Sequence, residues 1–334
     1  MIIKVKTKNG KYDIVLSRGA LNDSEKLLNL NRKVLIVTDD GVPADYADKI
    51  ACKCKTPIKV VLENGEKAKS VENYLSLLST MLENNFNRYD AVVAVGGGVI
   101  GDLAGFVASS YMRGVDFYNV PITFLSQVDS SIGGKVAIDY LDYKNVVGSF
   151  YQPKKVIIDP DTLKTLDGRQ LSAGIAESIK MAVTLDKKLF EFIENSEFND
   201  QTIDKIIEKS LLLKRKVVQK DVYEKNLRRV LNFGHTIGHA IESKNLNKLL
   251  HGECVALGML CLCDSSVKIR LKKVLEKFNL PTKIKIDGDL SELISHDKKA
   301  EEKSVNVVIV DKIGEFRIEK KDLDYLKERI GEIK

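Results

Sequence analysis

The sequence predicts an α/β N-terminal domain followed by a mostly α-helical C-terminal domain. Its 334 residues are more than a single domain usually holds. As far as residue 165, short β-branched runs alternate with helical patterns, which is typical of parallel strands joined by helices. Beyond this point long amphipathic patterns dominate. We therefore expect one domain over residues 1–165 and a second over residues 166–334.

The N-terminal elements follow from local patterns. Runs at Ile2–Lys6 and Tyr12–Leu16 flank Asn9 and Gly10, a pair that favours a hairpin turn. A helical spacing of apolar residues is clearest between Val71 and Leu82. Five further short runs rich in β-branched residues predict strands: Val34–Thr38, Ile58–Leu62, Ala91–Val95, Phe117–Val120 and Val156–Ile158.

The C-terminal half reads mainly as helices, with strand patterns returning near its end. Two short strands are expected at Val305–Val310 and Phe316–Ile318, on either side of Gly314. The helical patterns cover approximately residues 170–184, 187–194, 201–220, 228–243, 251–264 and 269–278.

Composition excludes several classes of protein. No run approaches the roughly 20 apolar residues that span a bilayer, so no membrane association is expected. The N-terminus lacks a signal-peptide core, and a cytoplasmic location is the expectation. The net charge of +6 comes from interleaved acidic and basic residues, which favours a small anionic ligand and gives no case for nucleic acid. Cys254, Cys261 and Cys263 lie in an apolar stretch and are expected to be buried free thiols.

A glycine-rich run, GGGVIGD at 96–102, directly follows the strand expected at Ala91–Val95. Its first, third and sixth residues match GxGxxG, the phosphate-binding turn of Rossmann-like domains, although tight turns after strands use glycine for other reasons. Asp102 then either accepts a hydrogen bond from a ribose or caps the following helix. A second polar run at 63–69 also follows a predicted strand, and would face the same crevice unless it is a solvated loop.

Histidine is scarce in this chain and is concentrated in one place. Three of the four histidines, His235, His239 and His251, fall within seventeen residues. Such a cluster indicates a metal site more than packed helix histidines. Arg228 and Asn232 precede His235 and His239 at spacings of four, three and four, which would place all four on one face of a helix.

Three further polar features each allow two interpretations. Glu177 and Lys180, one turn apart, form either a surface ion pair or a metal-ligand carboxylate with an adjacent lysine. Lys214 falls on the apolar side of its helix and either extends outward to solvent or meets an anion. The run LSQVDSSIGGK at 125–135 is either an anion-binding turn charged by Lys135 or a flexible surface loop.

Eight motifs in order closely resemble the 3-dehydroquinate synthase family, over about residues 58 to 260: GGGVIGD, SYMRGV, PITFLSQVDSSIGGK, KN at 144–145, FYQP, LSAGIAESIK, NFGHTIGHAIE and HGECVALGM. This family belongs to the sugar phosphate cyclases and is related in fold to the metal-dependent glycerol dehydrogenases. The resemblance implies an active site in the cleft between a Rossmann-like domain and a helical domain.

The resemblance also implies a reaction. The family is a lyase family that converts 3-deoxy-D-arabino-heptulosonate 7-phosphate to 3-dehydroquinate, on the route to chorismate and the aromatic amino acids. NAD oxidises C5 transiently, phosphate is eliminated, the ketone is reduced again and an aldol reaction closes the ring, without net redox. The implied cofactors are NAD and one divalent metal, Zn²⁺ or Co²⁺, and the implied assembly is a homodimer. A sibling cyclase with a non-carboxylate substrate and an NAD- and metal-dependent polyol dehydrogenase are the alternatives.

Individual roles are implied where residues match the family's motifs. The metal ligands are Glu177, His235 and His251, while His239 lies near the substrate phosphate. Arg113 reaches across the dimer, and either Lys298 or Lys299 binds the phosphate, whereas His296 has no implied role. The other substrate contacts are Asp129, Lys135, Asn145, Lys180, Lys214, Arg228 and Asn232. The NAD contacts are Asp39, Asn64, Gly65, Glu66, Lys69, Gly97, Gly98, Val99, Ile100, Gly101, Asp102, Ile122, Thr123, Lys135, Lys144, Thr162, Leu163, Lys164 and Thr165.

Overall fold

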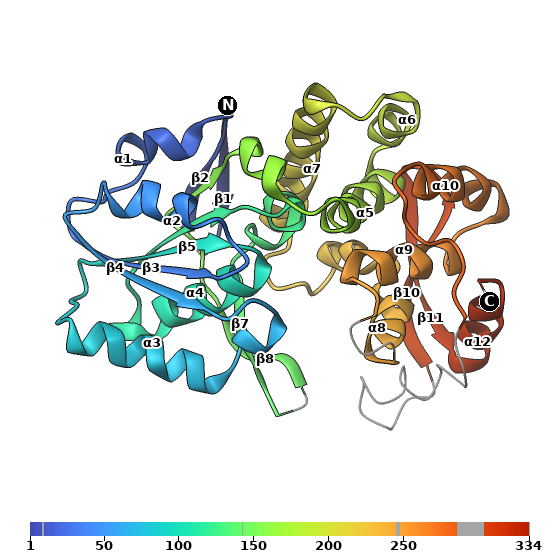
Figure 1. The fold of residues 1–334 in the computed structure, drawn as a ribbon. Coiled ribbons are helices and arrows are strands. Elements are labelled where there is room, and N and C mark those ends of the chain that lie inside the picture. Colours follow the sequence, from blue (N-terminus) through green and yellow to red (C-terminus); the bar gives the residue numbers. More distant parts are fainter. Residues whose placement is uncertain (9, 142, 245–247, 286–303, 334) are drawn as a thin grey trace. The chain divides into compact units, whose positions relative to one another are not determined.

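The computed structural model describes residues 1–8, 10–141, 143–244, 248–285 and 304–333. The chain divides into two compact units, Met1–Leu166 and Asp167–Lys334 (Figure 1). No helix in these described ranges is long and apolar enough to cross a membrane.

A seven-stranded sheet forms the centre of the first unit. β1 pairs antiparallel with β2, and every other neighbouring pair is parallel, which confirms the α/β prediction. The spatial order is β1-β2-β9-β6-β5-β3-β4. The strands are β1 (Ile2–Thr7), β2 (Gly10–Leu16), β3 (Lys33–Asp39), β4 (Thr56–Leu62), β5 (Ala91–Gly96), β6 (Asp116–Pro121) and β9 (Lys155–Ile158).

Helices cover both faces of this sheet (Figure 1). Successive side chains of a strand point to opposite faces, so Ile36 of β3 joins the core beneath α1 and α2, and Val37 joins the core beneath α3 and α4. The helices of the first unit are α1 (Ser24–Leu27), α2 (Ala44–Ala51), α3 (Val71–Glu83) and α4 (Gly98–Ser110).

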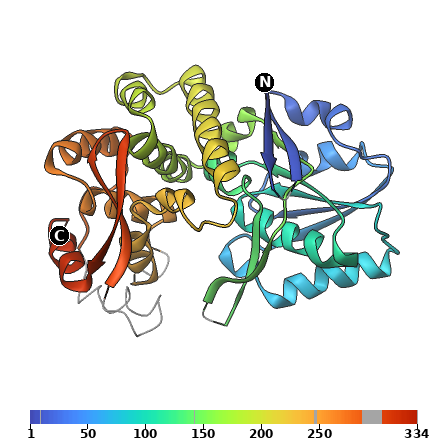
Figure 2. The ribbon, with the colours of Figure 1, turned by 180° about the vertical axis from the view of Figure 1, so that it is seen from behind.

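A second, two-stranded sheet in the first unit was not predicted. β7 (Lys135–Tyr140) and β8 (Tyr143–Phe150) pair antiparallel and extend away from the main sheet (Figure 2). Nearly all of β8 is exposed, with Tyr143 at 67% and Val146 at 58%. An exposed strand has no alternation of buried and exposed residues, so the pattern that predicts strands was missing.

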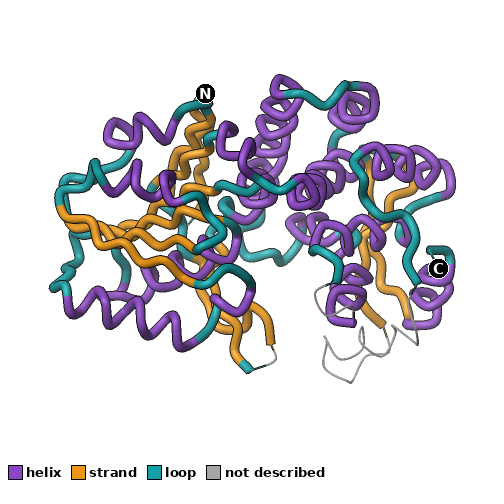
Figure 3. The backbone as a smooth tube through the Cα atoms, viewed as in Figure 1, coloured by secondary structure: helices purple, strands orange, loops and turns teal. Residues whose placement is uncertain are grey.

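In the described residues, the second unit consists mainly of helices with one two-stranded sheet (Figure 3). This confirms the prediction of a mostly α-helical C-terminal domain. Every residue of α9 after His251 is buried, and α9 packs against both α5 and α8. Several helices begin at a capping Asp or Asn, as α5 does at Asp167, whose side chain accepts from two backbone N–H groups. The elements are α5 (Gly168–Leu185), α6 (Lys187–Asn195), α7 (Asp200–Lys220), α8 (His235–Lys244), α9 (His251–Cys261), α10 (Ser265–Lys277), β10 (Ser304–Lys312), β11 (Glu315–Asp322) and α12 (Leu323–Gly331).

The single helix predicted over 228–243 is wrong. Residues Leu227–Asn232 form a 3₁₀ segment, and α8 starts only at His235. Gly234 breaks the helix with a φ of +78°, and a Cβ at this position would lie 2.7 Å from the Val255 carbonyl oxygen. Arg228 and Asn232 therefore do not share one helical face with the histidines.

Candidate functional site

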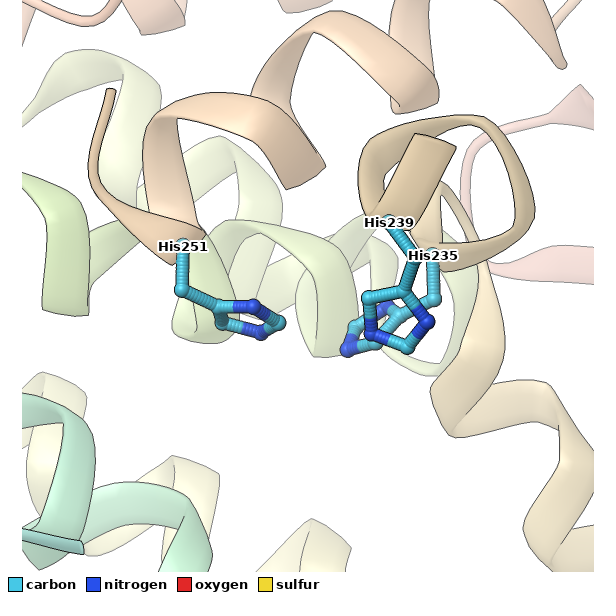
Figure 4. Close-up of side chains that lie close together, drawn as sticks. All are labelled: His235, His239 and His251. Atoms are coloured by element: carbon cyan, nitrogen blue, oxygen red, sulfur yellow. The ribbon is translucent and has the colours of Figure 1, made fainter. Parts of the chain in front are cut away.

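Three imidazole rings meet in the second unit. His235 and His239 project from α8 and His251 from the first residue of α9, and the three side chains face one another (Figure 4). One ligand nitrogen from each ring lies within 4.8 Å of the others. The ring centroids are 5.2 Å apart for His235–His239 and for His235–His251, and 5.8 Å apart for His239–His251. Ring spacing alone therefore does not select two ligands from the three.

Glu177 of α5 adds a carboxylate to this cluster. Its side chain is buried, and its Oε2 atom accepts a hydrogen bond from buried Lys180. Oε1 has no hydrogen-bond partner among the described residues. It lies 3.7 Å from Nε2 of His235 and 3.8 Å from Nε2 of His251. The predicted pair of Glu177 and Lys180 exists, but it is buried rather than on the surface.

Outer partners orient the two rings nearest to Glu177. Nδ1 of His235 lies 3.2 Å from the Phe233 carbonyl oxygen, and Nδ1 of His251 lies 2.9 Å from Glu242 Oε2. Each contact leaves Nε2 facing Glu177, which is the arrangement of a histidine ligand held by a second partner. His239 is exposed, whereas His235 and His251 are partly buried.

Burial and neighbouring charges act differently on the two rings. Burial, with Lys180 and the other imidazoles nearby, holds the pKa of His235 well below its usual value, so this ring stays neutral. Burial also opposes a charge on His251, but the hydrogen bond to Glu242 and the proximity of Glu177 raise its pKa overall. A neutral imidazole at His235 beside the carboxyl group of Glu177 suits a cation between them.

An ion pair fixes the start of α9 against α5. Arg169 donates to both carboxylate oxygens of Glu253, at 2.7 and 2.8 Å, and to the Lys248 carbonyl oxygen. Glu253 Oε2 also accepts from the backbone N–H of Leu250 at 2.8 Å, which caps the helix one residue before His251 begins it. Sequence reasoning assigned no role to Arg169, Glu242 and Glu253, because their contacts depend on how α5, α8 and α9 pack.

Three cationic side chains predicted to bind substrate are buried in the same unit. Lys180 is 1%, Lys214 4% and Arg228 3% exposed, which confirms Lys214 on the buried side of α7. Asp221 shapes the turn before Arg228 by accepting from three backbone N–H groups, among them that of Arg228. Asn232 is exposed and donates to Glu224 at 2.6 Å.

The residues predicted to bind NAD gather at one edge of the first unit's sheet. Apart from Lys135 and Lys144, which lie in β7 and β8, they stand at or after the carboxyl ends of parallel strands β3, β4, β5, β6 and β9, and such ends share one edge. Asn64 donates to Asp39 Oδ1 at 2.8 Å, joining the segments after β3 and β4. Thr162 accepts from Gln127 at 3.0 Å, and Thr165 bonds Tyr46 at 2.9 Å, both in the 3₁₀ segment Pro160–Thr165 after β9.

Lys69 joins two other residues that were predicted to bind cofactor or substrate. It is buried, lies 2.9 Å from Asp102, and also hydrogen-bonds Asn145 of β8. Burial alone would lower the pKa of Lys69, but Asp102 and Glu66 outweigh it and raise the pKa. Asp102 lies inside α4, which begins at Gly98, so the helix-capping interpretation of Asp102 is wrong.

The run at 125–135 is a largely buried turn rather than a surface loop. Ser126–Ser130 forms one π-helical turn that contains Asp129, a form often found at functional sites. Gly133 and Gly134 follow with φ of +102° and +67°, and the Gly134 carbonyl oxygen accepts from Tyr151 at 2.7 Å. The turn places Lys135 at the exposed start of β7.

The predicted site residues are divided between the two units. Arg113 belongs to the first unit, where it is exposed at the end of a 3₁₀ turn and has a φ of +66°. Lys298, Lys299 and His296 lie outside the described residues. The predicted metal ligands Glu177, His235 and His251, together with His239, belong to the second unit.

Comparison with known proteins identifies the family. The model of the 3-dehydroquinate synthase N-terminal domain matches residues 59–173, and that of the C-terminal domain matches residues 174–300. The chain belongs to the 3-dehydroquinate synthase family. The 3-dehydroquinate synthase of Campylobacter concisus is 39% identical over 326 residues, covering 93% of each chain.

Two solved structures show the same fold. A 2-deoxy-scyllo-inosose synthase complexed with carbaglucose-6-phosphate, NAD⁺ and Co²⁺ matches with a TM-score of 0.90 at 24% identity, covering 100% of both chains. The glycerol dehydrogenase of Schizosaccharomyces pombe matches with a TM-score of 0.67 at 16% identity, covering 100% of this chain and 90% of that one.

The family fixes the reaction. The chain is a lyase that converts 3-deoxy-D-arabino-heptulosonate 7-phosphate to 3-dehydroquinate and phosphate, as the motifs predicted. Its substrate is thus a small sugar phosphate, and neither the sibling cyclase nor the polyol dehydrogenase is favoured.

Proposed function

We propose that this chain performs the dehydroquinate-forming reaction with one divalent metal, Zn²⁺ or Co²⁺, held by Glu177, His235 and His251, and with NAD bound at the sheet edge of the first unit. The observation that carries the proposal is the buried Oε1 atom of Glu177, which has no hydrogen-bond donor among the described residues and is flanked by two Nε2 atoms.

These three side chains fit a metal ion. A buried carboxylate oxygen without a partner costs about 1–3 kcal/mol or more, and a cation removes that cost. Tetrahedral ligands at about 2.1 Å from zinc are about 3.4 Å apart. The separations of 3.7 and 3.8 Å from Glu177 Oε1 to the two imidazoles are close to this value. Two imidazoles and one carboxylate also form a common catalytic zinc shell with an open position.

The sheet edge fits a dinucleotide. α4 starts at Gly98, and Gly97 before it offers no side-chain cap, so the first backbone N–H groups remain available to a phosphate. A Cβ at Gly98 would approach Ser130 Oγ to 3.1 Å, and one at Gly97 would approach Thr123 Cγ2 to 3.3 Å. This close packing favours glycine at both positions. Lys69 and Asp102 supply charges beside it.

Glu177, His235 and His251 would hold the metal, which when bound would supply a Lewis acid for substrate hydroxyls, and bound NAD would supply a hydride acceptor and donor. The chain's own residues hold the substrate. Lys214 and Arg228 are both buried cations and suit the carboxylate of the substrate. A cyclase whose substrate has no carboxylate would not need such cations. His239, Lys135 and Asn145 suit the phosphate, and Asp129, Lys180 and Asn232 the hydroxyls.

We also propose a homodimer in which Arg113 contacts the phosphate bound by the partner. Arg113 is exposed, as is Met112 beside it at 46%. Exposed apolar side chains on β8, including Tyr143 and Val146, support a protein contact on this unit. A cytoplasmic location is supported by the five cysteines, all of which are free thiols.

One assay tests the proposal. The purified protein is incubated with the heptulosonate phosphate, NAD and Zn²⁺. We expect release of phosphate, formation of 3-dehydroquinate and no net NADH. Accumulation of NADH would indicate a dehydrogenase instead.

A variant tests the ligand set. His251→Ala should lose bound metal and activity while keeping a native circular-dichroism spectrum. Asp324→Ala, at a residue whose side chain is 94% exposed on α12, serves as the control and should behave as wild type. Full metal binding by His251→Ala would contradict the assignment.

A further inference from the structure

We infer that Glu242 is a positioning residue for metal binding, and that its carboxylate holds the His251 ring so that Nε2 stays directed at Glu177. The inference rests on the metal site proposed above and deepens it. Glu242 belongs to α8, and although it ends the motif NFGHTIGHAIE, no role is predicted for it from the sequence.

The geometry of the contact carries the argument. Glu242 Oε2 lies 2.9 Å from Nδ1 of His251, while Nε2 on the other side of the ring lies 3.8 Å from Glu177 Oε1. An imidazole has only two ring nitrogens, so a carboxylate on Nδ1 fixes the tautomer with Nε2 free. It also limits rotation of the ring about its side-chain bonds.

His251 needs this anchor more than His235 does. The His251 side chain is 32% exposed, against 15% for His235. It stands at the first residue of α9, directly after extended Leu250, so only one side of its backbone lies in a helix. Nδ1 of His235, by contrast, meets the backbone carbonyl of Phe233 within its own segment. One ligand is thus held by local backbone and the other by a side chain from a different helix.

Glu242 also links the two ligand-bearing helices. His235, His239 and Glu242 are spaced by four and three residues along α8, which places them on one face. That face meets α9, where a Cβ at Gly238 would lie 3.0 Å from the Cys254 carbonyl oxygen. The close packing brings the Glu242 carboxylate to the start of α9. A carboxylate there also increases the donor strength of the His251 ring towards a metal.

Two substitutions separate charge from contact. Glu242→Gln keeps an acceptor and the side-chain volume but removes the charge, and Glu242→Ala removes both. Glu197→Gln is the matched control, because it removes one negative charge from an exposed residue between α6 and α7. Zn²⁺ affinity is measured by competition with a chromophoric chelator, and site geometry by the visible spectrum of the Co²⁺ form.

We expect the Kd for Zn²⁺ to rise about 10-fold in Glu242→Gln and up to about 100-fold in Glu242→Ala, with no change in Glu197→Gln. Thermal unfolding of the metal-free proteins should remain close to that of wild type, because the effect is on the ligand and not on the core. If Glu242→Ala unfolds, the volume-conserving Gln variant still tests the inference.

The outcomes distinguish this inference from the site on which it rests. Zn²⁺ affinity within twofold of wild type in both Glu242 variants, together with metal loss in His251→Ala, would overturn the role of Glu242 and leave the ligand set intact. Lower metal-free stability with unchanged Zn²⁺ affinity would make Glu242 a purely structural residue and also overturn the inference. Normal metal binding by His251→Ala would instead reject the proposed site.

Discussion

Replacing Gly252 with alanine tests whether the contact between α5 and α9 positions the metal site. Gly252 follows His251 at the start of α9 and faces α5, which carries Glu177. A Cβ at Gly252 would lie 1.8 Å from the carbonyl oxygen of Ala173 and 2.5 Å from its carbonyl carbon. Both atoms are helix backbone, which cannot rotate away as a side chain can.

The size of the effect follows from these distances. A carbon and a carbonyl oxygen approach to about 3.3 Å at closest, so the two helices must separate by more than about 1 Å. Metal–ligand distances tolerate only about 0.2 Å. His251 would therefore leave its ligand position, and we expect the Kd for Zn²⁺ to rise at least about 100-fold. Overpacking at a backbone contact should also lower the free energy of unfolding by about 3 kcal/mol.

Chelator competition measures the affinity, and urea unfolding of the metal-free protein measures the stability. Gly168→Ala is the control, because Gly168 is the first residue of α5 and a Cβ there meets no atom within 4 Å. It should change stability by no more than about 1 kcal/mol and leave Zn²⁺ binding unaltered. Wild-type Zn²⁺ affinity in Gly252→Ala would refute the claim that this contact sets the ligand geometry.

Two further predictions concern other groups. Lys69→Met should raise the Kd for NAD about tenfold, measured by calorimetry, because a buried charged hydrogen bond to Asp102 is lost. Zn²⁺ binding should be unchanged in this variant. An equal loss of NAD and Zn²⁺ binding would indicate general unfolding instead. A disulfide reagent at pH 8 should label one thiol quickly, exposed Cys52, since burial raises the pKa of Cys54 to about 11 and those of Cys261 and Cys263 to about 12. Labelling of Cys54 should accelerate about tenfold per pH unit as its thiolate fraction grows, and rapid reaction of several thiols at pH 8 would contradict the buried environment.

The inner strands of the main sheet could be predicted because their residues are buried on both faces. Val34–Thr38 and Ala91–Val95 are continuous apolar runs, and each lies within an observed strand. The polar segments after them could then be assigned to one sheet edge from the direction of parallel strands alone. The exposed strand β8 has no such run of apolar residues. The hydrogen bond from Lys69 to Asn145 of β8 was therefore seen only in the structure.

The break at Gly234 could not be predicted from spacing. Arg228, Asn232, His235 and His239 have the spacing of one helical face, and a single glycine among them is tolerated in many helices. The reason for the break is tertiary, because Gly234 packs against the backbone of α9. The same holds for Glu242, whose contact with His251 requires α8 and α9 to be packed together first.

Residues that do not bind the metal themselves therefore determine the geometry of the proposed metal site as much as the proposed ligands do. The three proposed ligands come from three helices, α5, α8 and α9, so the packing of these helices decides whether the ligands meet. A Cβ at Gly258 of α9 would lie 2.0 Å from the Gly234 carbonyl oxygen, just before α8, and Gly252 makes the corresponding contact with α5. With a larger side chain at either position the helices would stand more than about 1 Å farther apart, several times the tolerance of a metal–ligand bond. The glycines fix the distance between the helices, and Arg169, Glu242 and Glu253 fix the orientation of His251 within that distance.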